Sequence, residues 1–293
     1  MISTGVDEIP NDTFQYTPKL VNLDLSHNSL ESVTKGMFTA LGNLHDLNLD
    51  SNSIENIENN AFQSLLNLTV LDLSLNALMS VNHQMFAGLT KLRHLNLNAN
   101  PMKKISNHTF KDLTDLNILD LSNNGVQSLN ENTFIGLNNL QVLRLNYNNL
   151  GYNTKQLPPG CFQPLESLKK LSVLENNPPG KVLSTFIFPD KTVKDLKMLE
   201  ILELDVNSDE ERILGIGFSS LHNLSSLIFS GVCNLSLFND TFKYTPHLTH
   251  LSIKHCNVMF IETGTFSILT KLEYVQLDFV CYVLVYKPYT LID

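Results

Sequence analysis

Histidine and cysteine are the residues of this 293-residue chain that are best suited to metal or redox chemistry. His250, His255 and Cys256 lie close together in sequence, and such side chains are common ligands of transition metals. The repeat phase described below places Cys256 in the interior, however, and the two histidines toward an exposed face. The nine histidines are otherwise scattered. We therefore expect no metal site and no cofactor, and a histidine pH switch would lack a cluster to carry it.

Catalytic motifs are not found in the sequence. It contains no G-x-S-x-G nucleophile elbow, no H-E-x-x-H helix and no glycine-rich phosphate loop. We expect a protein that is not an enzyme and has no catalytic residues.

The four cysteines do not form a recognisable disulfide framework. Cys233, Cys256 and Cys281 take equivalent places in neighbouring repeats, so their Cα atoms can come within disulfide range. Their side chains are nevertheless expected to run parallel into the core as free thiols. Cys161 stands alone, either unpaired or bonded to a cysteine outside this chain.

Asparagine also offers a modification chemistry, because Asn-x-Ser/Thr is the acceptor for N-glycosylation. Asparagine is abundant here, so chance alone supplies several such sequons, at Asn11, Asn67, Asn107, Asn223, Asn234 and Asn239. We expect the exposed sites to be the three that share one phase of the repeat, just before a phenylalanine: Asn11, Asn107 and Asn239.

The overall charge limits the class of partner. The chain has 20 Lys+Arg against 29 Asp+Glu, a formal net charge of −9. Nucleic-acid binding requires clustered cations, so a nucleic-acid partner is not favoured.

No apolar run reaches the roughly 18 residues of a membrane-spanning helix. The first residues have neither a basic nor an apolar segment, so no signal peptide is expected.

These side chains are positioned by a repeated unit. The pattern L-x-x-L-x-L-x-x-N-x-L-x-x-L-x-x-x-x-F-x-x-L begins at Leu20 and returns every 24 residues up to Leu116. Such a period marks stacked supersecondary units. We predict one solenoid over residues 1–293, with a partial unit at 1–19, repeats at 20–43, 44–67, 68–91, 92–115, 116–139, 140–167, 168–198, 199–223, 224–247 and 248–271, and an incomplete unit at 272–293.

Each unit opens with L-x-x-L-x-L, whose last positions alternate as in a short strand. Stacking lays these strands parallel, about 4.8 Å apart, as a concave sheet. A phenylalanine column is expected to form the spine behind it, with Val193 in one slot: Phe38, Phe62, Phe86, Phe110, Phe134, Phe162, Phe218, Phe242 and Phe266.

The ninth position of each unit is polar although core leucines flank it. A short amide there can both donate to and accept from the turning backbone. This predicts a structural ladder formed by Asn28, Asn52, Asn76, Asn100, Asn124, Asn148, Asn176 and Asn207, continued by Cys233, Cys256 and Cys281.

With phenylalanine at the nineteenth position, the unit resembles the animal extracellular class of leucine-rich repeats. Phrases such as LVNLDLSHNSL, NLTVLDLSLNAL and FKYTPHLTHLSIKHCNV resemble a Toll-like receptor ectodomain. The resemblance implies an α/β right-handed solenoid with a parallel concave sheet and an irregular, short-helical convex side. The cysteine caps, membrane helix and signalling domain of that family are missing, so we interpret the chain as a fragment.

Ligands of such coils usually bind on the concave face. Its variable positions form two columns, one at Asp24, Asn48, Asp72, Asn96, Asp120 and Arg144, and the other at Asn22, Asp46, Val70, His94, Ile118 and Val142. The candidate ligand-binding residues are Asp46, Asp72, His94, Asp120, Arg144 and Tyr147. The alternative is that Asp and Asn serve local solvation.

The over-length segments 150–160 and 176–192 are a second candidate surface, because insertions in solenoids map to loops. Their apolar residues form an exposed patch or else close the core: Leu183, Phe186, Ile187 and Phe188.

By resemblance, the chain is the ligand-recognition portion of an innate-immune pattern-recognition receptor. It would bind a microbial or endogenous protein, lipid or glycan and act as a homo- or heterodimer of the full receptor. It would lie on the extracellular side of a cell-surface or endosomal membrane, attached through parts outside this chain. The alternatives are a secreted or matrix scaffold without signalling and, to fit the missing signal peptide, a cytoplasmic repeat protein.

Overall fold

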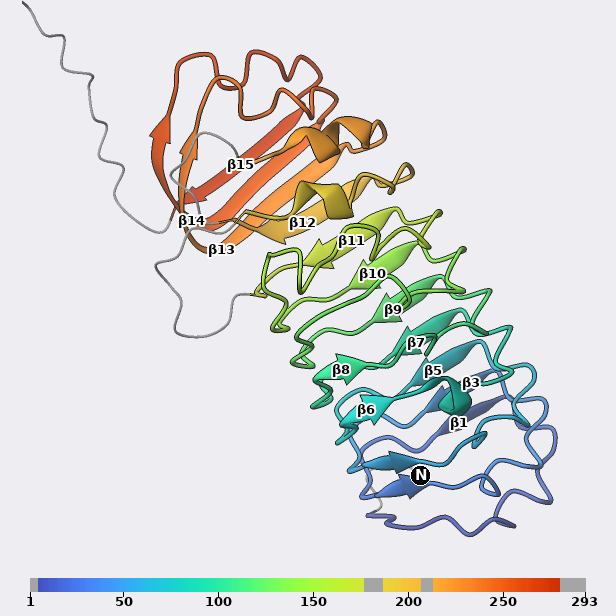
Figure 1. Cartoon of the computed structure of the whole chain (residues 1–293). Coiled ribbons are helices and arrows are strands. Elements are labelled where there is room, and N and C mark those ends of the chain that lie inside the picture. The colour runs from blue at the N-terminus through green and yellow to red at the C-terminus, as the bar shows by residue number, and fades with distance from the viewer. Residues whose placement is uncertain (1–4, 177–186, 207–212, 280–293) are drawn as a thin grey trace, which may run out of the picture.

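The computed structural model describes residues 5–176, 187–206 and 213–279, with the backbone alone for 231–234 and 279. The described chain is a stack of about ten coils, each of which contributes one strand to a continuous sheet (Figure 1). The sheet has eleven parallel strands in the order β1-β3-β5-β7-β9-β10-β11-β12-β13-β14-β15. Its members are β1 (Asn22–Asp24), β3 (Asp46–Asn48), β5 (Val70–Asp72), β7 (His94–Asn96), β9 (Ile118–Asp120), β10 (Val142–Arg144), β11 (Lys170–Val173), β12 (Ile201–Asp205), β13 (Ser226–Leu237), β14 (His250–Ile261) and β15 (Tyr274–Phe279).

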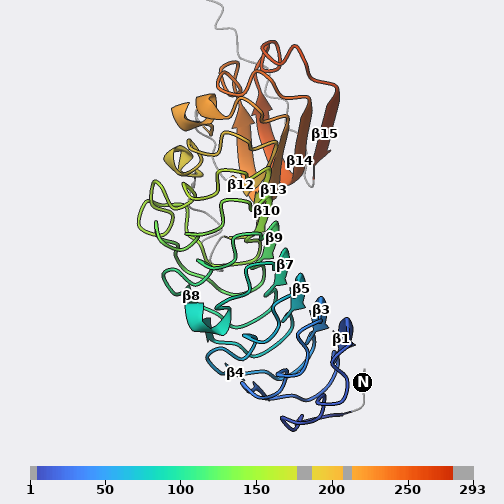
Figure 2. The same cartoon turned by 90° about the vertical axis from the view of Figure 1, so that its right-hand side faces the viewer.

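Little regular structure lies outside this sheet. Two parallel pairs join β2 (Ser32–Val33) to β4 (Asn56–Ile57) and β6 (Ser80–Val81) to β8 (Lys104–Ile105). The described helices are short 3-10 turns, η1 (His83–Met85), η2 (Asp190–Thr192) and η3 (Ile216–Ser220). The predicted parallel-strand solenoid is confirmed. The strands lie along the inner side of the curved stack (Figure 2).

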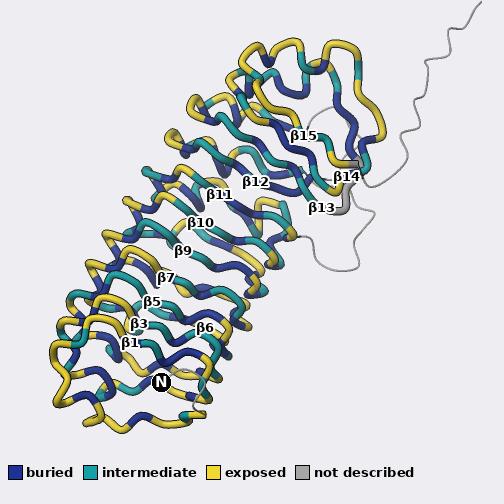
Figure 3. Tube along the Cα trace, turned by 180° about the vertical axis from the view of Figure 1, so that it is seen from behind, coloured by how far each residue is buried: buried dark blue, intermediate teal, exposed yellow. Residues whose placement is uncertain are grey.

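The burial of the strand residues follows the alternation of apolar and polar residues in the sequence. In β1, β3 and β7 only the central leucine is buried, while the residues on either side face solvent. The strands lengthen toward the C-terminal end, where β13 and β14 each have 12 residues. Along each coil, buried and exposed stretches alternate, so that the interior is a continuous apolar column (Figure 3).

Phenylalanine rings stack from coil to coil behind the sheet. Phe38 and Phe62 have ring centroids 6.1 Å apart, and Phe134 and Phe162 are 6.0 Å apart, both pairs nearly parallel. Phe266 closes the column as a partly buried ring against Phe242, and Val193 fills the slot in the long unit. Such ring contacts add to the burial energy of the interior.

The ladder asparagines close the turn that follows each strand. The Nδ2 of each of the seven described members donates to the carbonyls two and three residues before it, at Asn28, Asn52, Asn76, Asn100, Asn124, Asn148 and Asn176. In five of them Nδ2 also reaches the preceding coil, as from Asn148 to the Leu121 carbonyl at 2.9 Å. These bonds satisfy carbonyls that would otherwise be buried without a partner.

The residue just before each ladder position has a left-handed backbone. Eight residues take φ between 51° and 57°: His27, Ser51, Leu75, Ala99, Asn123, Tyr147, Glu175 and His255. This region is uncommon for residues other than glycine, and it persists where the surrounding structure determines it. At seven of these positions the asparagine that follows supplies that constraint, because its amide donates to the carbonyls one and two residues before the bend residue. The eighth, His255, is followed by Cys256.

Cysteine replaces asparagine at the ladder positions of the C-terminal coils. Asn207 and Cys281 lie outside the described residues, and the side chain of Cys233 is not described. Cys256 is buried and disulfide-bonded, which corrects the expectation of a free thiol. In the backbone register Cys233 and Cys256 are direct neighbours on β13 and β14.

Candidate ligand-binding site

The exposed face of the sheet carries two rows of side chains in register. The first row joins Asn22, Asp46, Val70, His94, Ile118 and Val142 as neighbours on successive strands. The second row joins Asp24, Asn48, Asp72, Asn96, Asp120 and Arg144 in the same way. We call this surface the sheet face. It brings five of the six predicted binding residues onto one surface, and Tyr147 lies three residues beyond Arg144 at the end of its coil.

Most members of the second row have a structural task. Their Oδ1 atoms accept a hydrogen bond from the backbone N–H two residues later, at 2.9 to 3.1 Å, in Asp24, Asn48, Asp72, Asn96 and Asp120. Asp and Asn both supply this acceptor. The turn hydrogen bond therefore explains why the second row contains Asp or Asn. It does not require the negative charge of the Asp members, which is available for binding a ligand.

The first three full coils make the sheet face acidic. Asp24, Asp46, Asp50 and Asp72 project there, and no lysine or arginine stands in the sheet rows of these described coils. The hydrogen bond from Ser26 is the largest influence on Asp24 and holds the pKa of its carboxyl below its usual value. Asp50 accepts hydrogen bonds from the Ser51 and Ser74 hydroxyls, and its ion-pair contact among the described residues is with a histidine, with 3.8 Å between His27 Nε2 and Asp50 Oδ2. No lysine or arginine within these described rows balances the acidic charge.

The remaining predicted residues have mixed environments. Asp120 and Arg144 form an ion pair, with 3.6 Å between Oδ2 and Nη1. Because both are partly solvated, such a pair contributes under about 1 kcal/mol to stability. Asp72 Oδ2 accepts from Asn96 Nδ2 at 2.9 Å, while His94 is exposed. Tyr147 is 58% exposed and has a left-handed backbone.

A second asparagine ladder, which the sequence analysis missed, runs along the flank where the strands begin. Asn43, Asn67, Asn139 and Asn223 lie just before the leucine that opens each unit. Each Nδ2 donates at 2.9 Å to a carbonyl of the preceding coil. The recurrence of Asn at this phase was the available signal.

This flank ladder separates the sequons into two groups. Asn11, Asn107 and Asn239 are exposed, and none of them belongs to the flank ladder. Asn67 and Asn223 use in the ladder the Nδ2 atom that a glycan would modify. The side chain of Asn234 is not described.

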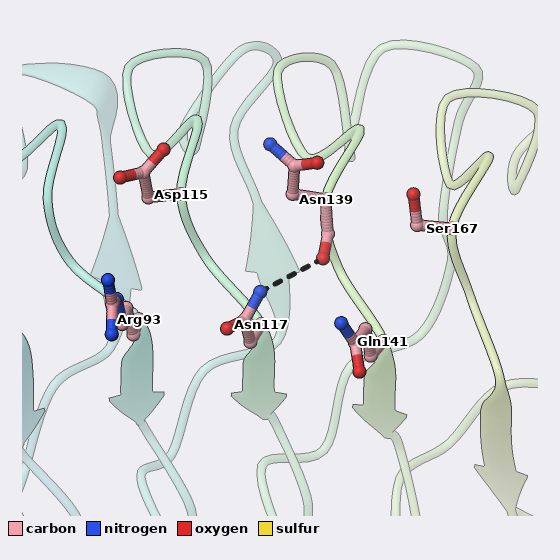
Figure 4. A pocket seen from close by; sticks show the side chains of 6 residues that line it. All are labelled: Arg93, Asp115, Asn117, Asn139, Gln141 and Ser167. Carbon is pink, nitrogen blue, oxygen red and sulfur yellow. Dashed lines mark hydrogen bonds between the residues drawn. The ribbon is translucent and has the colours of Figure 1, made fainter.

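A polar groove of about 290 Å³ opens on the same flank (Figure 4). It is lined by Arg93, Asp115, Asn117, Asn139, Gln141 and Ser167. Arg93, Asn117 and Gln141 each directly precede a strand, β7, β9 and β10 respectively. Asp115, Asn139 and Ser167 each precede the leucine that opens a unit. We call this the flank groove.

The second candidate surface, formed by the over-length segments, is described only in part. Leu183 and Phe186 lie outside the described residues. Phe188 is 1% exposed and packs edge-on against Tyr152, with ring centroids 5.2 Å apart. Of the two alternatives left open for this residue, Phe188 fits the second, because its ring closes the core of an over-length coil.

Asp205 is a buried carboxyl beneath that coil. Its Oδ2 accepts from the Asn176 N–H at 2.9 Å, and its Oδ1 has no hydrogen-bond partner among the described residues. Burial is the main reason that its pKa is raised to about 7. The Tyr152 hydroxyl donates to the Val173 carbonyl at 2.7 Å and accepts from the Asp205 N–H at 3.3 Å.

Reactive chemistry finds little support in the described part of the chain. The Cys161 thiol is free and buried, and burial raises its pKa to about 12, so it is not poised as a nucleophile. Among the described residues, no group of three His, Cys, Asp or Glu side chains is placed to hold a metal ion. Across those same residues, no helix is long and apolar enough to span a bilayer.

The repeat model "BspA type Leucine rich repeat region" matches the chain in six copies, over residues 7–141 and 80–203. The chain belongs to this leucine-rich-repeat family. A search of curated proteins finds no match to the leucine-rich-repeat chain.

Solved structures with the same fold come from distant relatives. The TLR13–ssRNA13 complex superposes with a TM-score of 0.78 at 24% identity, covering 92% of this chain and 41% of that one. The Drosophila Toll–Spatzle complex has a TM-score of 0.70 at 24% identity, covering 94% and 40%. The Leptospira interrogans leucine-rich-repeat protein LIC12759 has a TM-score of 0.68 at 23% identity, covering 92% and 62%. The chain thus spans less than two thirds of each of these proteins, and the likeness shows the fold alone.

Proposed function

We propose that this chain is the ligand-recognition portion of a receptor resembling Toll-like receptors. It binds a ligand non-covalently on the sheet face, and pairing of two full receptors transmits the event. The observation that carries this proposal is the continuous eleven-stranded sheet, whose exposed rows present a broad surface of varied side chains. A solenoid with such a surface is suited to holding a macromolecule.

Two further observations support a receptor on the extracellular side. Cys256 is disulfide-bonded, and structural disulfides persist in oxidising compartments. Asn11, Asn107 and Asn239 are exposed sequons that glycosylation in the secretory pathway can reach. The Toll–Spatzle and TLR13–ssRNA13 complexes are precedents for ligand binding by this fold. The membrane anchor and the signalling domain belong to the parent receptor.

The charge of the sheet face specifies the ligand further. Asp24, Asp46, Asp50 and Asp72 repel a phosphate backbone and attract a cationic surface. We therefore assign a basic protein ligand and do not carry over the single-stranded RNA of the TLR13 complex.

Removing charge from the sheet face will weaken this recognition. The test presents the chain on cells, joined to the membrane and signalling segments of a Toll-like receptor with a reporter. Secreted protein fractions, separated by charge, serve as probes. Basic fractions will activate the reporter, and the double variant Asp46→Asn/Asp50→Asn will raise the concentration for half-maximal response by about tenfold or more. Asp24 and Asp72 stay unchanged, because asparagine there would create new Asn-Leu-Ser sequons.

A double variant with the same charge change away from the sheet face, Asp7→Asn/Asp195→Asn, serves as the control and will respond like the original chain. If no fraction activates the reporter, or if both double variants respond alike, the sheet face is not the receptor surface.

The second candidate is a secreted or matrix scaffold without signalling. The fold is equally compatible with this role, because a broad sheet face can hold a protein whether or not the binding is signalled further. Retention of a basic protein on the sheet face without any reporter response would support this alternative.

A further inference from the structure

The geometry points to the flank groove as a binding site for a neutral, linear oligosaccharide. This site is separate from the sheet-face rows, and it does not depend on the proposed receptor function. Six side chains from three successive repeats line the groove, and all of them are polar. A groove of this composition disfavours lipids and other apolar ligands, which need hydrophobic walls.

Several of these groups are available to a ligand. The side-chain ends of Arg93, Asp115 and Gln141 form no hydrogen bond or ion pair with any residue that the structure describes. Figure 4 shows Arg93 and Asp115 at one end of the groove, Gln141 and Ser167 at the other, and Asn117 and Asn139 between them. The groove therefore offers donors and acceptors along its whole length.

The central pair is held in place before any ligand arrives. Asn117 Nδ2 donates to the Asn139 carbonyl at 3.2 Å, and Asn139 Nδ2 donates to the Thr114 carbonyl at 2.9 Å. These bonds reduce the side-chain entropy that binding would otherwise cost.

The chemistry of the lining matches hydroxyl groups. A sugar hydroxyl both donates and accepts, and carboxamides, a serine hydroxyl, a carboxylate and a guanidinium complement it in both senses. The charges of Arg93 and Asp115 cancel, so the groove has no cationic cluster for a polyanion such as nucleic acid.

The spacing favours sugars over peptides. The rows Arg93, Asn117, Gln141 and Asp115, Asn139, Ser167 repeat with the coils, about 4.8 Å apart. Side chains on one side of an extended peptide recur about 6.7 Å apart, which is out of step with the coils. One unit of a linear β-linked glucan is close to one coil spacing in length, so successive sugar rings meet successive coils.

The test uses cellotetraose as the sugar probe and tetraglycine as the peptide probe, with binding followed by saturation-transfer NMR and calorimetry. Cellotetraose will bind the unchanged chain, and Gln141→Leu and Asp115→Leu will each weaken its binding by about tenfold. Both side chains are exposed, so the thermal melts will match that of the original chain.

Matched variants outside the groove, Gln63→Leu and Asp195→Leu, will bind cellotetraose as before. Three results would overturn the inference: no cellotetraose binding to the unchanged chain, equal weakening in the groove and matched variants, or binding of tetraglycine alone. The last result would assign the groove to a peptide. None of these outcomes bears on the sheet-face experiment, whose variants lie outside the groove.

Discussion

Replacing Asn148 with aspartate will lower the free energy of unfolding by about 4 kcal/mol or more, although the two side chains have nearly the same size. The Asn148 amide donates to the carbonyls of Leu121, Leu145 and Asn146 at 2.9 to 3.3 Å, and its Oδ1 accepts from the Gly125 and Val126 N–H groups. A carboxylate keeps the acceptors but cannot donate, so three carbonyls lose their partner and face a negative charge. Urea unfolding followed by circular dichroism measures the loss.

The same chemical change on the surface is the control for this prediction. Asn43 is exposed and makes one side-chain hydrogen bond, to the Pro18 carbonyl at 2.9 Å. Asn43→Asp will cost about 1 kcal/mol or less, because water replaces the lost partner. If Asn148→Asp and Asn43→Asp lower the free energy of unfolding equally, the ladder asparagines that include Asn148 do not hold the coils together.

Replacing Asp205 with asparagine will stabilise the chain at pH 8 by about 4 kcal/mol and leave it nearly unchanged at pH 4. The folded-state pKa of Asp205 is raised to about 7 from an ordinary value of 3.8. Between these values the folded chain binds more protons than the unfolded chain, so the stabilising contribution of this carboxyl is complete below about pH 4. It is lost as the pH rises through 7, because the buried carboxylate must then carry its charge.

The measurement is the difference in unfolding free energy between the original chain and Asp205→Asn across pH 4 to 8, which removes the contribution of the histidines. Asp7→Asn, at an exposed carboxyl, will show no such difference. A difference that stays constant with pH would mean that Asp205 is ionised throughout and is better solvated than its burial indicates.

The repeated pattern alone was sufficient to predict the architecture. A 24-residue unit with leucines at strand spacing has no way to bury its apolar side except against a copy of itself, so a stack of parallel strands follows. The alternation around Leu23, Leu47 and Leu71 also determines which side chains reach the sheet face, because neighbouring strand residues point to opposite sides. For the same reason the two face rows have the register that the unit length implies.

Contacts between coils were decided only by the tertiary structure. The flank ladder joins atoms about one repeat apart in sequence, such as Asn139 Nδ2 and the Thr114 carbonyl, and it depends on how the turns stack. Phe188 and Asp205 lie where units of unequal length meet, so the repeat phase does not assign their burial. Local alternation determines the direction of a side chain, whereas the partner that it meets depends on the coil packed above or below it.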